Sequence, residues 1–144
     1  MNITVLRDIN DWWVTGSVQA SFLEPVTRKV TADILSAMEE RQTILLEGPR
    51  RVGKTSIIFH IIQNLLGQGI DPRQIIYVSL DDPLIQKARF FETLVELIET
   101  HLIAGKIQAI KGKFYFFLDE ITHLEDWELY IKRYYAQKYP FKFI

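Results

Sequence analysis

The sequence contains no cysteine, no large excess of either charge and no long apolar run. Without cysteine it can have no disulfide framework and no thiolate metal site. The formal net charge of −1 gives no support for nucleic-acid binding or for attraction to an anionic membrane, although a local basic patch stays open. The longest apolar run, Phe114 to Leu118, is far too short to span a bilayer. The N-terminus lacks the pattern of a secretory signal, so we expect a soluble, cytoplasmic protein.

Apolar residues make up 48% of the chain and aromatic residues 12%, which is enough for the packed core of about one domain. Residues 1–25 show no sustained period, and we expect an irregular lead-in there, followed by the domain proper over residues 26–144. Within that domain apolar runs alternate with helical stripes, which predicts βαβ units, a parallel sheet and a ligand site at the carboxyl ends of the strands. Buried strands are predicted at Thr43–Leu46, Ile75–Leu80, Phe114–Leu118 and, as a beginning, Phe141–Ile144, and helices at about 26–41, 56–66, 90–102 and 126–139.

The residues between the first predicted strand and the helix after it fit the phosphate-binding P-loop pattern G-x-x-x-x-G-K-[ST]. A fortuitous glycine-lysine turn is the alternative, and the flanking strand and helix argue against it. In a P-loop the glycines admit the close approach of a phosphate, while backbone N–H groups and the helix N-terminus bind its charge. Lys54 is expected to reach the β- and γ-phosphates, and the Thr55 hydroxyl to ligate Mg²⁺. The predicted nucleotide-binding residues are Gly48, Pro49, Arg50, Arg51, Val52, Gly53, Lys54, Thr55 and Ser56.

A pair of carboxylates follows the third predicted strand. Asp119 ends the apolar run Phe114–Leu118, as in the Walker B arrangement, where a buried strand delivers a carboxylate to a bound Mg²⁺. Glu120 beside it could orient and partly deprotonate an attacking water, which suits hydrolysis better than transfer to a bound acceptor. Strands often end in acidic residues, so the pair alone is a weak signal. Its distance from Thr55 suits two βαβ crossovers, and together the motifs predict a site of nucleotide hydrolysis.

Other polar and aromatic residues leave alternatives open. Arg50-Arg51 could screen phosphate charge, meet an acidic partner or form a solvated loop face. Trp12-Trp13 could stack on adenine or cover the nucleotide, or they could anchor the lead-in on the domain. Asp81-Asp82 could hold a water or contact the nucleotide region, or they could start a helix. A lone loop histidine such as His123 is typical of a surface position.

Three segments together resemble one family. They are Gln42–Thr55, Val78–Pro83 and Phe117–Ile121, the last followed by Asp126-Trp127-Glu128. These segments are similar to the prokaryotic AAA+-type ATPases whose P-loop reads GPRRVGKT and whose Walker B strand ends LDEI, with an aspartate-tryptophan pair soon after. The resemblance covers the chain from Asn10 to the C-terminus.

The resemblance implies a P-loop NTPase fold of the AAA+/ASCE-like type, which is an α/β three-layer sandwich with a mostly parallel sheet. It implies ATP as the nucleotide and Mg²⁺ as the metal ion, with Lys54 and Thr55 contacting phosphate and Mg²⁺. It also implies that Asp119 is the Mg²⁺ carboxylate and that Glu120 is the catalytic base. The predicted catalytic residues are therefore Glu120 and Lys54, and the predicted metal ligands are Thr55 and Asp119.

Length is the departure from the family pattern. In such ATPases the strand after Walker B inserts between the P-loop strand and the Walker B strand, and its tip carries a polar sensor residue. Only Phe141–Ile144 remain to begin this strand, so we expect a truncated chain whose sheet is incomplete at the C-terminus. Exposed apolar surface would then favour self-association, a protein partner or a missing C-terminal domain.

The leading functional prediction is an ATP-binding, Mg²⁺-dependent P-loop ATPase domain with weak hydrolysis. The alternative is a non-catalytic nucleotide-dependent binding module or a remnant fragment. A small-molecule kinase is disfavoured because Glu120 suits water activation. The sequence does not select among DNA processing, defence and partner remodelling as the process that ATP serves.

Overall fold

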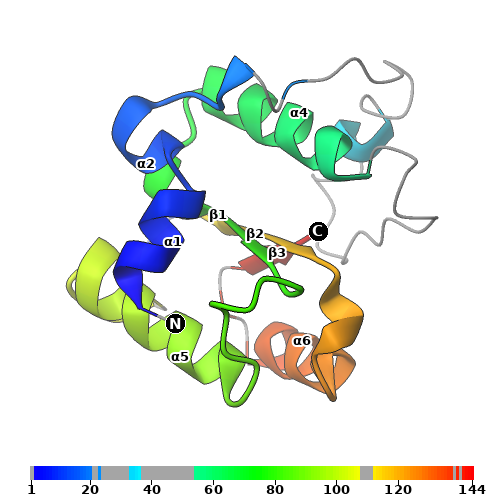
Figure 1. Ribbon diagram of the computed structural model, residues 1–144. Coiled ribbons are helices and arrows are strands. Elements are labelled where there is room, and N and C mark those ends of the chain that lie inside the picture. The colour runs from blue at the N-terminus through cyan, green and yellow to red at the C-terminus, as the bar shows by residue number, and fades with distance from the viewer. Residues whose placement is uncertain are drawn as a thin grey trace.

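The computed structural model of the chain describes residues 2–20, 23, 33–36, 54–107, 112–137, 139 and 141–144, and of Lys54 only the backbone. Within this part the centre of the molecule is a parallel sheet of three strands in the order β1-β2-β3 (Figure 1). The strands are β1 (Ile75–Ser79), β2 (Phe114–Asp119) and β3 (Phe141–Phe143). All three agree with strands that the sequence predicts, and residues 33–36 are helical as expected. The strand predicted at 43–46 lies outside the described residues.

The strand register brings the carboxyl ends of β1 and β2 together. Ser79 of β1 is opposite Asp119 of β2, and the two strands run in the same direction. β3 pairs with β2 on the side away from β1. The pairing continues to the last residue, because the Ile144 N–H donates to the Phe116 carbonyl at 2.8 Å. The family resemblance implies a strand between the P-loop strand and the Walker B strand, and the pairing of β3 with β2 agrees with the second of these two neighbours.

Helices cover both faces of the sheet and make three layers (Figure 1). α4 (Lys54–Gly67) lies over one face, and α5 (Phe90–Leu97) and α6 (Trp127–Ala136) lie over the other. The predicted α/β sandwich with a parallel sheet is therefore confirmed. None of the helices that the structure describes is long and apolar enough to cross a membrane. Between the strands and helices lie a π-helical turn at Ile98–Leu102 and 3₁₀ turns at Pro72–Gln74 and Ile121–His123.

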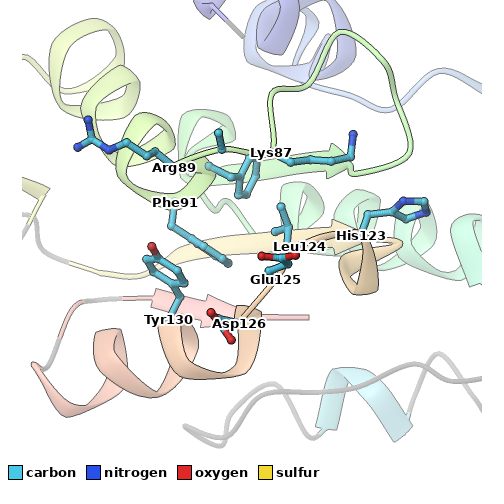
Figure 2. A pocket seen from close by; sticks show the side chains of 10 residues that line it. Lys87, Arg89, Phe91, His123, Leu124, Glu125, Asp126 and Tyr130 are labelled. Carbon is cyan, nitrogen blue, oxygen red and sulfur yellow. The ribbon is translucent and has the colours of Figure 1, made fainter.

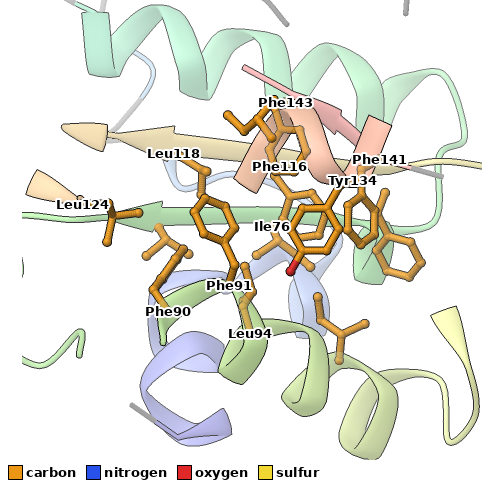
Figure 3. Close-up of a cluster of buried hydrophobic side chains, with 14 of the residues drawn as sticks. Ile76, Phe90, Phe91, Leu94, Phe116, Leu118, Leu124, Tyr134, Phe141 and Phe143 are labelled. Carbon is orange, nitrogen blue, oxygen red and sulfur yellow. The ribbon is translucent and has the colours of Figure 1, made fainter. Parts of the chain in front are cut away.

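The face of the sheet under α5 and α6 is an aromatic core (Figure 3). The ring centroids of Phe116 and Phe141 lie 4.7 Å apart, edge to face, and those of Phe116 and Phe143 lie 5.3 Å apart and stacked. Phe91 of α5 and Tyr134 of α6 close over them, with their ring centroids 6.0 Å apart. All five side chains are buried. Because burial of each large apolar side chain contributes about 1.5–3 kcal/mol, this face supplies much of the folding energy.

The opposite face of the sheet packs against α4. The buried α4 side chains recur at helical spacing and lie over alternate residues of the strands. α4 ends at Gly67, and Gly69 just beyond it has φ 88°, a left-handed conformation that glycine adopts without steric cost. The buried residues of α4 are Ile58, Phe59, Ile61, Ile62 and Leu65, and those of the sheet face are Ile75, Tyr77, Phe117 and Ile144.

The N-terminal residues form two short helices where the sequence predicts an irregular lead-in. α1 (Ile3–Ile9) begins after Asn2, whose side chain caps its first turn, and α2 spans Trp12–Thr15. Helices of this length are not stable in isolation, and they are too short to show a clear period in the sequence. Burial of Leu6 and Trp12 in the two cores stabilises them here. The expectation of irregular structure is wrong for the residues of these two helices, while the domain boundary stays a prediction.

Side chains from this N-terminal part satisfy the outer edge of β1. The Asn10 carboxamide accepts from the Tyr77 N–H at 2.6 Å and donates to the Tyr77 carbonyl at 3.0 Å, as a neighbouring strand would. The indole N–H groups of Trp12 and Trp13 both donate to the Ile75 carbonyl, at 3.0 and 2.9 Å. Because an open strand edge invites pairing with other chains, these bonds protect β1 from it.

The segments after β1 and β2 differ in detail from the expected ones. No helix starts at Asp81-Asp82: the Asp82 carboxylate accepts from the Leu84 N–H at 2.9 Å in a turn, and α5 begins only at Phe90. α6 follows Asp126 as predicted. Aspartate is a common N-cap residue, but Asp126 has φ 58° and its side chain caps no N–H. A left-handed residue lacks the extended geometry of an N-cap, which accounts for the missing bond.

Asn10→Ala should lower the free energy of unfolding by about 2 kcal/mol or more, measured by urea unfolding. Asn10 is fully buried, and its loss leaves the N–H and carbonyl of Tyr77 without partners, at about 1–3 kcal/mol each. The control is Asn64→Ala, because Asn64 is exposed on α4 and its loss should cost less than about 0.5 kcal/mol. Small, equal effects in both variants would contradict the role assigned to Asn10.

Alkaline pH should destabilise the protein through Tyr134. Burial raises the pKa of Tyr134 to about 12 from its ordinary value of 10.0, so the unfolded chain loses this proton at a lower pH than the folded chain. The stabilising contribution is complete below pH 10.0 and is lost as pH rises toward about 12, so the free energy of unfolding should fall over this range. In urea titrations at rising pH, Tyr134→Phe should make that fall less steep. An equally steep fall in the variant would refute the assignment.

Candidate nucleotide-binding site

A hydrogen bond joins the start of α4 to the end of β2. The Thr55 hydroxyl donates to Asp119 Oδ2 at 2.8 Å, although the two residues lie 64 positions apart in the chain. Thr55 is exposed in the first turn of α4, whereas Asp119 is the last residue of β2 and only 8% exposed. The structure thus brings together the two residues that the sequence predicts as metal ligands, and their role as ligands stays a prediction.

The other predicted site residues surround the start of α4. Lys54 is the first residue of α4, so the helix begins at the lysine of the P-loop pattern. Ser56 is half-buried in the first turn. The positive N-terminal end of α4, which favours phosphate, therefore lies next to the Asp119 carboxylate. The loop residues Gly48, Pro49, Arg50, Arg51, Val52 and Gly53 lie outside the part of the chain that the structure describes.

Tyr77, a residue that the motifs do not point to, also contacts Asp119. Its hydroxyl donates from β1 to the same Asp119 Oδ2 at 2.8 Å. Burial raises the pKa of Tyr77 well above its ordinary value, and the negative charge of Asp119 raises that pKa further. The hydroxyl therefore keeps its proton and stays a donor. One signal was present in the sequence: a tyrosine inside the apolar run Ile75–Leu80, where a buried hydroxyl needs a partner.

Ring packing one turn after Thr55 fixes the position of α4. Phe59 is four residues further along the helix, so the two side chains share one helix face. The centroid of the Phe59 ring lies 4.8 Å from that of Tyr77 and 6.2 Å from that of Trp12. The same helix face therefore packs on Tyr77 and presents Thr55 to Asp119.

Glu120 has a left-handed backbone directly after β2. Its φ is 56° and its ψ is 44°, a region that costs a residue other than glycine about 1–2 kcal/mol. Its carbonyl accepts from the His123 N–H at 3.2 Å in the turn that follows. Glycine would remove this strain, and strained residues gather at functional sites. The Glu120 side chain is half-buried, and its role stays a prediction.

The oxygen atoms of the Thr55–Asp119 contact fit Mg²⁺. A hydroxyl and a carboxylate are the oxygen ligands that Mg²⁺ takes, and it demands few of them from protein. Among the residues that the structure describes, no group of three or more His, Cys, Asp or Glu side chains could hold a metal ion. A site with one or two protein oxygens leaves positions for water and for phosphate oxygens, which is how Mg²⁺ is bound together with nucleotides.

The remaining sequence candidates do not take part in the Thr55–Asp119 hydrogen bond itself. Trp12 is fully buried and Trp13 partly buried, and both donate to β1. They anchor the N-terminal part, and Trp12 has no face free for a base. Asp81 accepts a hydrogen bond from the Ser79 hydroxyl, next to the end of β1. His123 is exposed in the turn after β2, as expected for a surface residue.

A cavity of about 440 Å³ lies between the loops that follow β1 and β2 (Figure 2). The rings of Phe91 and Tyr130 stack at its wall, with centroids 5.0 Å apart. Lys87 and Arg89 also line it, but their side chains extend in different directions in Figure 2, so their charges do not converge on one point. Neither residue of the Thr55–Asp119 contact lines this cavity.

The fold and the site define a class of protein. A P-loop sequence that ends in the first turn of a helix, with its threonine bonded to an aspartate at the end of a parallel strand, is typical of the P-loop NTPases. A family model described as an AAA domain matches residues 40–144, most of the chain. The chain belongs to this AAA domain family, which comprises nucleotide-binding domains of the ATPase type. No curated protein and no solved structure matches the sequence.

Glu120→Gly should be more stable than Glu120→Ala by about 1 kcal/mol in urea unfolding. Both variants lose the carboxylate, but only alanine retains the cost of the left-handed backbone. At a position with ordinary backbone angles the order would be reversed, because glycine loses more chain entropy on folding. An alanine variant that is the more stable of the two would show that the backbone at Glu120 is unstrained.

Proposed function

We propose that the chain binds ATP together with Mg²⁺ and hydrolyses the ATP to ADP and phosphate. Membership of the AAA domain family supports nucleotide binding of the ATPase type. The observation that carries the proposal is the hydrogen bond between Thr55 and Asp119. It holds a P-loop hydroxyl beside a strand-end carboxylate, the pair of protein groups that P-loop enzymes use for Mg²⁺.

Phosphate binding falls to the P-loop and to the N-terminal end of α4. In the proposed complex Lys54 contacts the β- and γ-phosphates, and N–H groups of the loop and the first turn of α4 donate to phosphate oxygens. Gly48 and Gly53 allow the backbone to come close to them. Thr55 and Asp119 would hold Mg²⁺, which would neutralise part of the phosphate charge. The other residues of the proposed binding segment are Pro49, Arg50, Arg51, Val52 and Ser56.

Glu120 is the proposed general base. Its carboxylate orients a water in line with the bond between the γ-phosphate and ADP, and it takes up the proton as the water oxygen bonds to phosphorus. ADP leaves with the electrons of the broken bond, and Lys54 stabilises the charge that develops on the γ-phosphate. A positioned general base contributes about 10²–10⁴-fold to the rate. The position of Glu120 next to Asp119, at the carboxyl end of β2, supports this role.

The partners and the location of the protein stay predictions from the sequence. Self-association, a protein partner or a further domain would each cover the apolar surface that an incomplete sheet is expected to expose. The net charge of −1 lends no support to a nucleic acid as partner. A cytoplasmic location also stays a prediction from the amino-acid sequence.

Glu120→Gln should preserve Mg-ATP binding and reduce turnover by about 10²–10⁴-fold, because the amide keeps the shape of the side chain but cannot take a proton. Turnover is measured as phosphate release. Binding is measured as the rise in melting temperature, since ligand at about 100 times its dissociation constant adds about 2.7 kcal/mol to stability. Binding without turnover in the parent protein would instead identify a non-catalytic nucleotide-dependent binding module.

Lys54→Ala is the control for binding. It removes the charge that contacts the phosphates, so the rise in melting temperature with Mg-ATP should disappear. The variant must still unfold cooperatively without ligand, which shows that the fold is intact. A parent protein whose melting temperature Mg-ATP does not change would contradict nucleotide binding itself.

A further inference from the structure

Asp119 Oδ2 accepts hydrogen bonds from two hydroxyls of different origin. One belongs to Thr55 in the P-loop motif, and the other belongs to Tyr77, which no motif accounts for. Tyr77 is 6% exposed and Asp119 is 8% exposed. Because both partners are shielded from solvent, water is a poor substitute for the bond between them.

Tyr77 is itself held on several sides. Its backbone N–H and carbonyl are both bonded to the Asn10 carboxamide, and its ring packs on Phe59 of α4. Asn10 is in turn fully buried and donates to the Leu6 carbonyl at 2.8 Å. The Tyr77 hydroxyl therefore has little freedom, and a carboxylate that accepts from it is confined to one orientation.

We infer that Tyr77 is a positioning residue for the metal ligand Asp119. Its hydroxyl holds the carboxylate in the orientation in which Asp119 and Thr55 bind Mg²⁺ with the nucleotide. The inference rests on the proposed function, because it requires that Asp119 serves Mg²⁺. It assigns a part in metal binding to a residue outside both motifs, and through Asn10 it makes the N-terminal helices part of the support of the site.

Loss of the Tyr77 hydroxyl has two opposing effects on Asp119. The carboxylate oxygen loses a donor and carries more negative charge, so it attracts a cation more strongly. Because one hydrogen bond contributes a modest free energy, we expect this effect to raise the affinity for Mg²⁺ by roughly 2–10-fold. The carboxylate also loses its fixed orientation, and partners that orient metal ligands are worth about 10–100-fold in metal affinity. The loss of orientation is the larger effect, so the expected net result is weaker Mg²⁺ binding.

Tyr77→Phe keeps the ring and removes only the hydroxyl. The measurement is the rise in melting temperature that ATP produces, followed over a series of Mg²⁺ concentrations. We expect the Mg²⁺ concentration that gives half of the full rise to increase about 10-fold or more, while the rise with ATP in EDTA stays as in the parent. Calorimetric titration in the cold, with Mg²⁺ added to the ATP-bound protein, repeats the comparison where a less stable variant remains folded.

Tyr115→Phe is the matched control. Tyr115 also packs on the α4 side of the sheet, but it lies opposite Ile75 at the other end of the strands, so its Mg²⁺ midpoint should equal that of the parent. If the parent responds to Mg²⁺ and Tyr77→Phe has the same midpoint, or if both variants shift equally, this inference fails and the proposed function stands. A parent whose ATP response is independent of Mg²⁺ overturns both.

Discussion

Asp119 joins the layers of the molecule through a single carboxylate oxygen. That oxygen accepts from Thr55 at the start of α4 and from Tyr77 in β1, each at 2.8 Å. A carboxylate that is 8% exposed needs donors, because a buried charge without partners is costly. Both of these donors are neutral hydroxyls. A neutral hydroxyl donor stabilises the Asp119 carboxylate without cancelling its negative charge.

The residues before the family-matched segment belong to the same structure as the segment itself. The match covers residues 40–144, but the outer edge of β1 is closed by Asn10 and the two tryptophans, and Leu6 is buried in the aromatic core. Without these residues the backbone of Tyr77 would lie open, and the hydroxyl that bonds Asp119 would lose its support. The N-terminal helices therefore act on the candidate site through the edge of the sheet.

Local patterns in the sequence predict the three strands and the helices α4, α5 and α6, because apolar runs and helical stripes involve only neighbouring residues. Motif spacing likewise predicts that Thr55 and Asp119 share a site. The seven residues of α1 are too few to show a period, and the burial of Leu6 that stabilises this helix is a tertiary contact. The bond from Tyr77 to Asp119 spans 42 positions and forms only when β1 and β2 are paired in register. The left-handed backbone of Glu120 has no sequence signal at all, because nothing about glutamate favours it.

The two faces of β2 end differently, because only the α4 face carries a carboxylate, and this difference favours the observed register. Because side chains alternate along a strand, a slip by one residue would exchange the faces. Asp119 would then enter the aromatic core, where an unpaired carboxylate costs several kcal/mol, and the core would lose its phenylalanines to the α4 side. The aromatic core lies on the face of the sheet opposite Asp119. It nevertheless helps to place Asp119 beside Thr55, because it favours the register that puts Asp119 on the α4 face. The residues of β2 on the aromatic face are Phe114, Phe116 and Leu118, and those on the α4 face are Tyr115, Phe117 and Asp119.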